Sequence, residues 1–380
     1  VEAGAREAAA IRQALEANAG VRRLAANPLL LTALVLVHRA SGRLPHRRVE
    51  AYIEVCNALG RTWRSVHGVA EADLPDERIL HRWLAEVGAW LHEHRPEGAA
   101  SKRELLAVLG PLWAKYDGST WDPAVLEDAD PLNTEAGRGV VDFVEKVDAH
   151  TGLLVERAPG RYGFVHQTFE EYYTGRALAF RGSDADRITA IRSRLHDPRY
   201  EEPILLALGL IGTDYAEQID EVVAHAIWPA RDNPSPYEEI LGRDFLFMLR
   251  VLADDIPLER TATIDTILNQ AIDEYLNPDM SRCRFRAYQQ ALTERLAGLG
   301  ATKAGERFRS AIDARIPQLT QDQLAPWCQL AGIAARLGPL ASTTITTLAE
   351  LATGDADPWV RALAVRVLAA EDRLSDSVVD

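Results

Sequence analysis

Cysteine and methionine are scarce in this chain of 380 residues, which contains three cysteines and two methionines. Cys56, Cys283 and Cys328 are widely separated, and none belongs to a CxxC or Cys/His pattern with metal-ligand spacing. This pattern predicts buried, reduced thiols in a reducing compartment such as the cytoplasm. It argues against a cysteine-based metal site.

Long apolar runs are also lacking. The longest one near the start, residues 28–37, is too short to span a bilayer, and no signal peptide precedes it. We therefore expect a cytoplasmic protein without a membrane contact. The chain begins with Val1 inside a helical pattern, which we interpret as a piece of a longer protein.

Positive charge is outnumbered, since 42 Lys and Arg face 56 Asp and Glu, for a formal net charge of −14. Such a field repels a phosphate backbone, so nucleic acid is not an expected partner. Hydrophobic residues make up 47% and charged residues 26%, which is ordinary for folded domains. The length suits two or three domains, or one domain followed by an elongated array.

Catalytic motifs are missing. The sequence has no G-x-x-x-x-G-K-[ST] phosphate loop, and it lacks G-x-S-x-G, H-E-x-x-H and G-x-G-x-x-G. Glu127, Asp128 and Asp130 are close together but lack the glycine and terminal glutamate of a calcium loop, so we interpret them as solvated. We therefore expect no enzymatic activity and no metal site in this chain alone.

What the sequence does contain is helical periodicity. Apolar spacing and start signals predict helices over residues 5–17, 28–38, 43–63, 76–94 and 135–150, with a loop over 115–134. Ser101 and Glu104 have the spacing of a capping box. Asn27 is placed to cap the second helix, with Pro28 at its first position. The expected fold is mainly α.

One segment departs from this periodicity. Residues 152–157 and 162–165 are β-type runs on either side of Pro159 and Gly160, which predicts a hairpin. The second run leads through His166 into an amphipathic helix. A lone hairpin among helices is typical of a winged-helix element. The apolar face of this segment is predicted to be core, and it comprises Phe164, Phe169, Tyr172 and Leu178.

Beyond residue 183 the sequence predicts one helix after another, separated by Gly, Pro, Asp and Asn. Asp197-Pro198 and Asp357-Pro358 each precede an aromatic residue and an apolar run. This is typical of stacked helix pairs, as in an α-solenoid of HEAT-like repeats, although no fixed period emerges.

Three motifs in order carry a family resemblance: Asn27-Pro28-Leu29-Leu30-Leu31, the segment 44–52 leading to Trp63, and the segment 164–172 around His166. Over roughly residues 1–212 the chain resembles the C-terminal half of the NACHT module in STAND signalling NTPases. The resemblance implies the end of a small helical domain at 1–42, a winged-helix domain at 43–181 and a helical-repeat sensor at 182–380. The family's nucleotide-binding core, with its Walker motifs, is expected upstream of Val1.

The resemblance also implies two nucleotide contacts. Pro28 would pack beside the adenine, and His166 would reach the β-phosphate of bound ADP. From the residues alone, Pro28 can equally be a simple helix initiator, and His166 is more simply a strand-end histidine satisfied by local backbone. ADP or ATP with magnesium would bind the parent protein, and none is expected to bind this chain tightly. Arg43, Arg47 and Arg48 are interpreted as a solvated helix start.

The function implied is the regulatory and sensor portion of a NACHT-type protein. The winged helix would hold ADP in the resting state, and the repeats would detect a protein trigger and permit oligomerisation. The Ala/Arg-rich composition suggests a bacterial source and defence against phage. The alternative is a stand-alone helical-repeat scaffold with no nucleotide role. A winged-helix DNA binder is disfavoured by the net charge and by the lack of a basic recognition helix.

Overall fold

The computed structural model describes residues 2–16, 21, 24–25, 27–45, 47–67, 76–228, 233–277, 281–300, 302–354 and 357–376. It forms two compact units, Val1–Tyr215 and Ala216–Asp380. The first unit extends past the predicted boundary at residue 181. The boundaries 42/43 and 181/182 therefore stay predictions. The expected end of the first helix, around Ala17, and His46 of the second motif lie outside the described residues.

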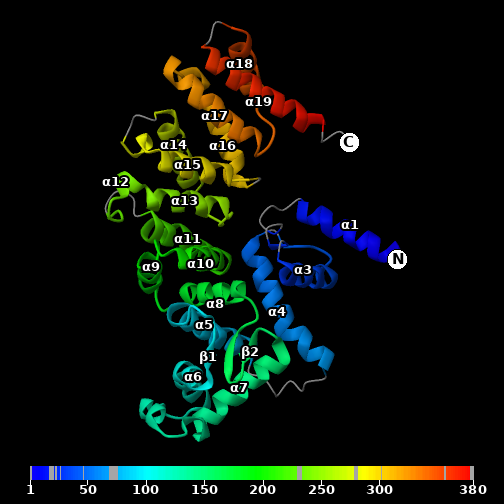
Figure 1. Cartoon of the computed structure of the whole chain (residues 1–380), viewed down its shortest axis with the longest axis vertical. Coiled ribbons are helices and arrows are strands. Elements are labelled where there is room, and N and C mark those ends of the chain that lie inside the picture. The colour runs from blue at the N-terminus through cyan, green and yellow to red at the C-terminus, as the bar shows by residue number, and fades with distance from the viewer. Residues whose placement is uncertain are drawn as a thin grey trace. The chain divides into compact units, whose positions relative to one another are not determined.

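Helices make up most of the first unit (Figure 1). They are α1 (Glu2–Glu16), α3 (Pro28–Ser41), α4 (Arg48–His67), α5 (Glu77–His94), α6 (Lys102–Asp117), α7 (Glu135–Thr151), α8 (Gln167–Ala179), α9 (Asp184–Arg192) and α10 (Glu201–Asp214). The helix predicted from residue 43 begins only at Arg48, because Leu44 and Pro45 lie outside any helix or strand. The predicted loop at 115–134 contains two 3-10 turns, Pro123–Glu127 and Pro131–Asn133, each begun by a proline.

A small antiparallel sheet lies among these helices, in the order β1 (Ala100–Ser101), β3 (Arg161–Phe164), β2 (Leu154–Ala158). The predicted hairpin of β2 and β3 is confirmed, with Leu154 opposite Phe164 and a left-handed Gly160 (φ 70°) in the turn. Strand β1 was not predicted, because two residues carry no alternating pattern. Its Ser101 pairs opposite Arg161 and also caps α6 in the predicted capping box with Glu104.

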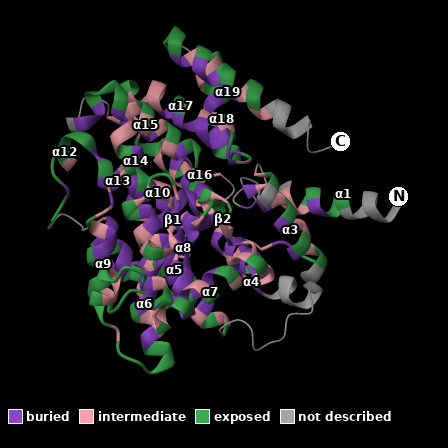
Figure 2. Ribbon diagram, turned by 60° about the horizontal axis from the view of Figure 1, so that its bottom comes forward, coloured by how far each residue is buried: buried purple, intermediate pink, exposed green. Residues whose placement is uncertain are grey.

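Helix α8 forms the centre of this unit and packs on one side against α5 and on the other against α10. Two glycines permit these close approaches. A Cβ at Gly88 of α5 would lie 2.9 Å from the Cβ of Tyr173, and one at Gly175 of α8 would lie 2.6 Å from the carbonyl of Pro203. Figure 2 shows the buried residues of α5 and α8 in purple. The predicted core face is confirmed, since Phe164, Phe169, Tyr172 and Leu178 are all buried.

Helices make up all the regular secondary structure among the described residues of the second unit. They are α11 (Ala216–Val222), α12 (Glu238–Leu241), α13 (Arg243–Ala253), α14 (Thr261–Leu276), α15 (Arg286–Ala297), α16 (Lys303–Arg315), α17 (Leu324–Ala335), α18 (Ser342–Thr353) and α19 (Pro358–Asp376), with a π-helical turn at Val223–Ile227 and 3-10 turns at Ser281–Arg284 (η6), Ile316–Gln318 and Gln321–Gln323. Helices near in sequence pack together, as α13 does with α15 and α14 with α16. Such packing suits stacked helix pairs, while the HEAT assignment stays a prediction.

The two Asp-Pro signals both mark helix starts. Asp197 accepts a hydrogen bond from the backbone nitrogen of Arg199 (3.0 Å) at a 3-10 turn that leads into α10. Asp357 does the same for Trp359 (2.8 Å) at the start of α19. The three cysteines are free and buried, as predicted. Among the described helices, none combines the length and apolar character that a bilayer crossing requires.

Candidate functional site at the start of α8

His166 lies between β3 and α8 and serves as the N-cap residue of that helix, with an extended backbone (φ −149°, ψ 149°). Its Nδ1 accepts the backbone N–H of Thr168 at 3.2 Å. Helix caps are more often Ser, Thr, Asp or Asn, so here a ring nitrogen replaces the usual side-chain oxygen. The cap results from the local sequence. Strand β3 ends at Phe164, and the backbone is still extended at His166, where the helix begins.

This cap determines which ring nitrogen of His166 carries the proton. A neutral imidazole has one lone-pair nitrogen, and the N–H of Thr168 points at Nδ1. The proton of the neutral ring is therefore on Nε2, which becomes a hydrogen-bond donor.

Asn27 meets this donor from the other side. Its Nδ2 lies 3.1 Å from Nε2 and 3.4 Å from Nδ1 of His166, across 139 residues of sequence. The Oδ1 of Asn27 is 3.4 Å from the backbone nitrogen of Leu30, in the position of a cap on α3. The side chains of two cap residues therefore touch, and the N-termini of α3 and α8 lie together. Helix N-termini carry unpaired N–H groups and partial positive charge, which favours anions.

The two predicted site residues thus lie at neighbouring helix starts. Pro28 occupies the exposed first position of α3, directly after Asn27, and His166 is half-buried. Asn27 was predicted only as a helix cap. Its contact with His166 has no signal in the sequence, because it depends on how helices 139 residues apart are packed.

Tyr52 of α4 packs against the first turns of α8. Its ring stacks on Tyr172 at 5.5 Å and meets Phe169 edge-on at 6.5 Å. Its hydroxyl hydrogen-bonds the side chain of Thr168, and burial raises its pKa. Thr168 supplies the N–H that fixes the tautomer of His166. By bonding the side chain of Thr168, Tyr52 helps to hold this N–H in position.

Two carboxylates, Glu171 of α8 and Glu202 of α10, lie near the start of α4. Arg48 forms an ion pair with Glu202 of α10, and its side chain is only 11% exposed. The interpretation of Arg48 as a solvated residue was therefore wrong, because α10 covers the start of α4. Burial, and next the charge of Glu202, raise the pKa of Glu171 to about 7. A carboxyl group that titrates near neutrality therefore lies in the first turns of α8.

Glu170 points elsewhere, as expected for neighbours on a helix. It is buried, and its Oε1 lies 3.1 Å from Nδ1 of His92 on α5. The other ring nitrogen, Nε2, lies 2.9 Å from the carbonyl of Arg199, just before α10. Burial lowers the pKa of His92, but the hydrogen bonds to Glu170 and to the carbonyl of Arg199 outweigh it and raise the pKa overall. His92 thus joins α5, α8 and the entry of α10.

Within the described parts of the chain, no group of three or more His, Cys, Asp or Glu could hold a metal ion. The site instead brings together side-chain hydrogen-bond groups of Asn27 and His166 and the N-termini of α3 and α8. Catalytic groups arranged as a nucleophile with a base are not seen in its described residues.

These features define a winged-helix domain: α-helices, a three-stranded sheet and a terminal hairpin that leads into α8. Residues 48–178 match the family model of the winged helix-turn-helix domain C-terminal to NACHT. Over these residues the chain is therefore similar to the winged-helix domain that follows NACHT modules. Searches of curated proteins and of solved structures give no match to this chain.

Proposed function

We propose that this chain is the regulatory and sensor portion of a NACHT-type STAND NTPase. In the resting state its winged helix holds ADP, with His166 at the β-phosphate and Pro28 beside the adenine. The helical repeats detect a protein trigger, and release of the winged helix permits ATP loading and oligomerisation. We extend the proposal to a cytoplasmic protein of antiphage defence, on the resemblance and the composition alone.

The observation that carries the proposal is the contact between Asn27 and His166. It brings the asparagine of the N-P-L motif to the histidine of the winged helix, although the two are 139 residues apart. With the proton of His166 on Nε2, this nitrogen and Nδ2 of Asn27 are two donors 3.1 Å apart, so neither can accept from the other. A phosphate oxygen that approaches both could accept from each of them. The dipoles of α3 and α8 would add to the attraction.

The proposal is tested in the intact parent protein that carries the upstream core. His166→Ala should release ADP during purification and raise basal signalling, because the closed state loses a phosphate contact. Bound nucleotide is measured by chromatography after denaturation of the purified protein. His94→Ala is the matched control, since His94 is exposed at the end of α5.

Unchanged ADP retention and signalling in His166→Ala would refute the phosphate contact and favour the stand-alone scaffold. A second measurement uses the 380-residue chain itself. Titration calorimetry should show weak ADP binding, because most phosphate contacts would belong to the core. Sub-micromolar affinity would place the nucleotide site within this chain instead.

A further inference from the structure

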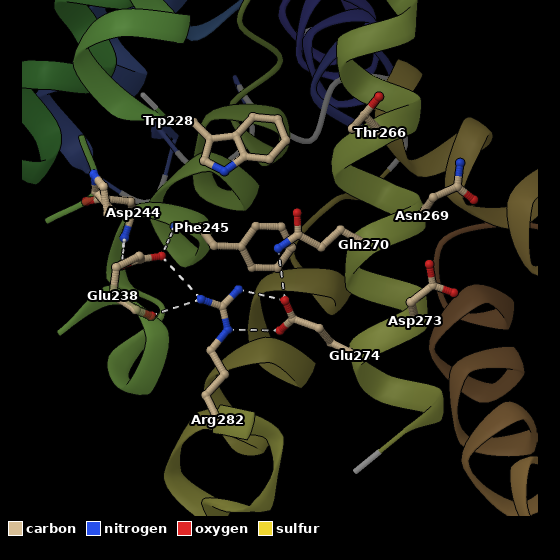
Figure 3. Close-up of a pocket in the computed structure, with 11 residues that line it drawn as sticks. Trp228, Glu238, Asp244, Phe245, Thr266, Asn269, Gln270, Asp273, Glu274 and Arg282 are labelled. Atoms are coloured by element: carbon tan, nitrogen blue, oxygen red, sulfur yellow. Dashed lines mark hydrogen bonds and ion pairs between the residues drawn. The ribbon is translucent and has the colours of Figure 1, made fainter. Parts of the chain in front are cut away.

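A cavity of about 860 Å³ lies in the second unit and has two unlike walls (Figure 3). One wall is a polar stripe along α14, at the helical spacing i, i+3, i+4, i+7 and i+8, formed by Thr266, Asn269, Gln270, Asp273 and Glu274. The facing side combines the apolar residues Trp228, Pro234 and Phe245 with the carboxylates of Glu238 and Asp244. Its volume falls in the range typical of ligand sites.

Arg282 of η6 fixes the floor of this cavity. Its Nη2 donates to Glu274 Oε1 at 2.6 Å, and its Nη1 donates to the carbonyl oxygen of Glu238 at 3.0 Å. Glu238 in turn accepts the backbone N–H groups of Asp244 and Phe245 at 2.9 and 3.1 Å. These contacts hold the walls in one geometry before any ligand arrives.

The lining is negative overall. Four lining carboxylates, Glu238, Asp244, Asp273 and Glu274, outnumber the guanidinium groups of Arg282 in the lining and of Arg315, which pairs with Asp273. Glu238, Asp244 and Glu274 are engaged by the interior contacts of this network. Asp273 differs, because its side chain is 53% exposed while its Oδ1 shares an ion pair with Arg315 at 2.6 Å. Asp273 is thus the carboxylate that an incoming cation can reach.

An apolar rim adjoins the cavity. We define it by four large side chains: Tyr237 just before α12, Ile240 and Leu241 on α12, and Phe285 after η6. Their exposed fractions are 67%, 44%, 44% and 45%. The rim and the cavity share residues, since Glu238 of α12 lines the cavity and Arg282 joins it to η6. Several exposed apolar side chains in one place are typical of a protein-binding surface.

We propose that the cavity and this rim bind a protein segment in which an arginine or lysine is flanked by apolar residues. The basic head group enters between the indole of Trp228 and the carboxylate of Asp273, and the flanking residues cover Ile240 and Leu241. A cation is favoured by the negative lining and by the indole face, whereas an anionic segment would be repelled. The proposal names the class of trigger for the sensor role proposed above and rests on that role only for the consequence of binding.

Fluorescence anisotropy of the 380-residue chain with a labelled peptide tests the proposal. The peptide alternates arginine with leucine and phenylalanine, and its two counterparts carry citrulline or glutamate in place of arginine. We expect saturable binding of the arginine peptide, affinity lower by about tenfold or more for the citrulline peptide, and no binding of the glutamate peptide.

Variants locate the binding. Asp273→Asn and Trp228→Ala should each weaken binding of the arginine peptide about tenfold. Glu350→Gln on α18 removes the same charge outside the cavity and should leave the affinity unchanged. Tyr237→Gly separates binding from folding, because Tyr237 has a left-handed backbone (φ 63°) that glycine adopts freely. That variant should keep or raise the melting temperature and still bind more weakly.

Three results would overturn the proposal: no saturable binding of the arginine peptide, equal affinity for the citrulline peptide, or equal effects of Asp273→Asn and Glu350→Gln. These readouts are separate from ADP retention by the intact parent. Loss of the His166 role therefore leaves the peptide result standing, and the converse also holds.

Discussion

The two compact units differ in how far along the chain their polar contacts reach. In the first unit, Asn27 meets His166 across 139 residues and His92 meets the carbonyl of Arg199 across 107. In the second unit, Arg282 reaches Glu274 across 8 residues and Arg307 reaches Asp265 across 42. Contacts between segments distant in sequence hold the first unit together, and such contacts favour all-or-none unfolding. In the second unit the contacts join segments nearer in sequence, which favours unfolding in local steps.

The largest expected effect comes from removing one buried ring in each unit. Phe169 and Phe308 are both fully buried, so Phe169→Ala and Phe308→Ala should each cost about 3–5 kcal/mol of unfolding free energy. The pattern should differ, since Phe169→Ala should raise amide exchange across α4, α5, α8 and α10 together. Phe308→Ala should raise it mainly in α14, α16 and α17. Exchange measured by mass spectrometry distinguishes them, and uniform loss of protection across 216–380 would contradict the local picture.

The next effect uses two buried ion pairs that differ in their response to pH. The folded-state pKa of His92 is raised, so its contact with Glu170 stabilises the fold fully below the unfolded histidine pKa. That stability is lost as the pH rises through the folded-state pKa. Relative to wild type, His92→Gln should lose about 1.5–3 kcal/mol at acidic pH and less at alkaline pH.

Arg282→Gln supplies the comparison in the second unit. Because a guanidinium stays protonated, breaking its contact with Glu274 should cost a similar amount at every pH above the unfolded pKa of glutamate. Burial raises the pKa of Glu274, but its hydrogen bonds, above all that from Arg282, outweigh burial and lower the pKa overall. The cost should therefore fall only as the pH drops through that lowered pKa. Urea unfolding of both variants at several pH values measures this contrast. A His92→Gln penalty that does not change with pH would show that the imidazole is not charged in the folded protein.

Two glycines test how closely the helices of each unit must approach. Gly88→Ala should cost about 1–3 kcal/mol, because the added methyl would meet the Cβ of Tyr173 and the backbone of Thr174. Gly332→Ala in α17 should cost less, since its methyl would meet only the end of the Val367 side chain at 3.2 Å. Thermal unfolding measures both. Equal penalties would mean that the α5–α8 contact can relax as freely as α17 against α19.

The smallest effect concerns the two Asp-Pro starts. Asp197→Ala and Asp357→Ala should each cost about 1 kcal/mol through the lost cap. Asp197→Ala should lose somewhat more stability than Asp357→Ala, because Asp197 also accepts a hydrogen bond from the Arg199 side chain at 2.7 Å. The corresponding asparagine variants, which retain the cap, are the controls. The denaturant midpoints of the variants measure these losses of stability. If neither alanine variant were less stable than wild type, the Asp side chains would not contribute to helix initiation.

Local features of this chain were predictable from the sequence because each depends on a few adjacent residues. The hairpin, the Ser101–Glu104 box and the buried face around Phe169 are confirmed. The start of α4 was misplaced because Pro45 suggested a helix opening, whereas the helix begins three residues later at Arg48. A proline at a helix start and a proline before one look alike in sequence.

The candidate site was predictable only in part. Pro28 and His166 came from a resemblance, and their nucleotide roles stay predictions. The contact of Asn27 with His166 and the burial of His92 depend on packing between segments more than 70 residues apart. The ion pair of Arg48 shows the same limit, because its partner Glu202 belongs to a helix 154 residues away. No local pattern carries such information.

Ser101 has a consequence for how this domain can change in length. The residue ends strand β1 opposite Arg161 and also caps α6, so sheet register and helix start depend on the same backbone position. A one-residue insertion between Ala100 and Ser101 would shift the strand register or detach the helix cap. At the exposed tip of the hairpin, Pro159 and Gly160 join β2 to β3 and do not also cap a helix. Insertions in related domains are therefore expected at the tip of the hairpin, and the joint at Ser101 should keep its length.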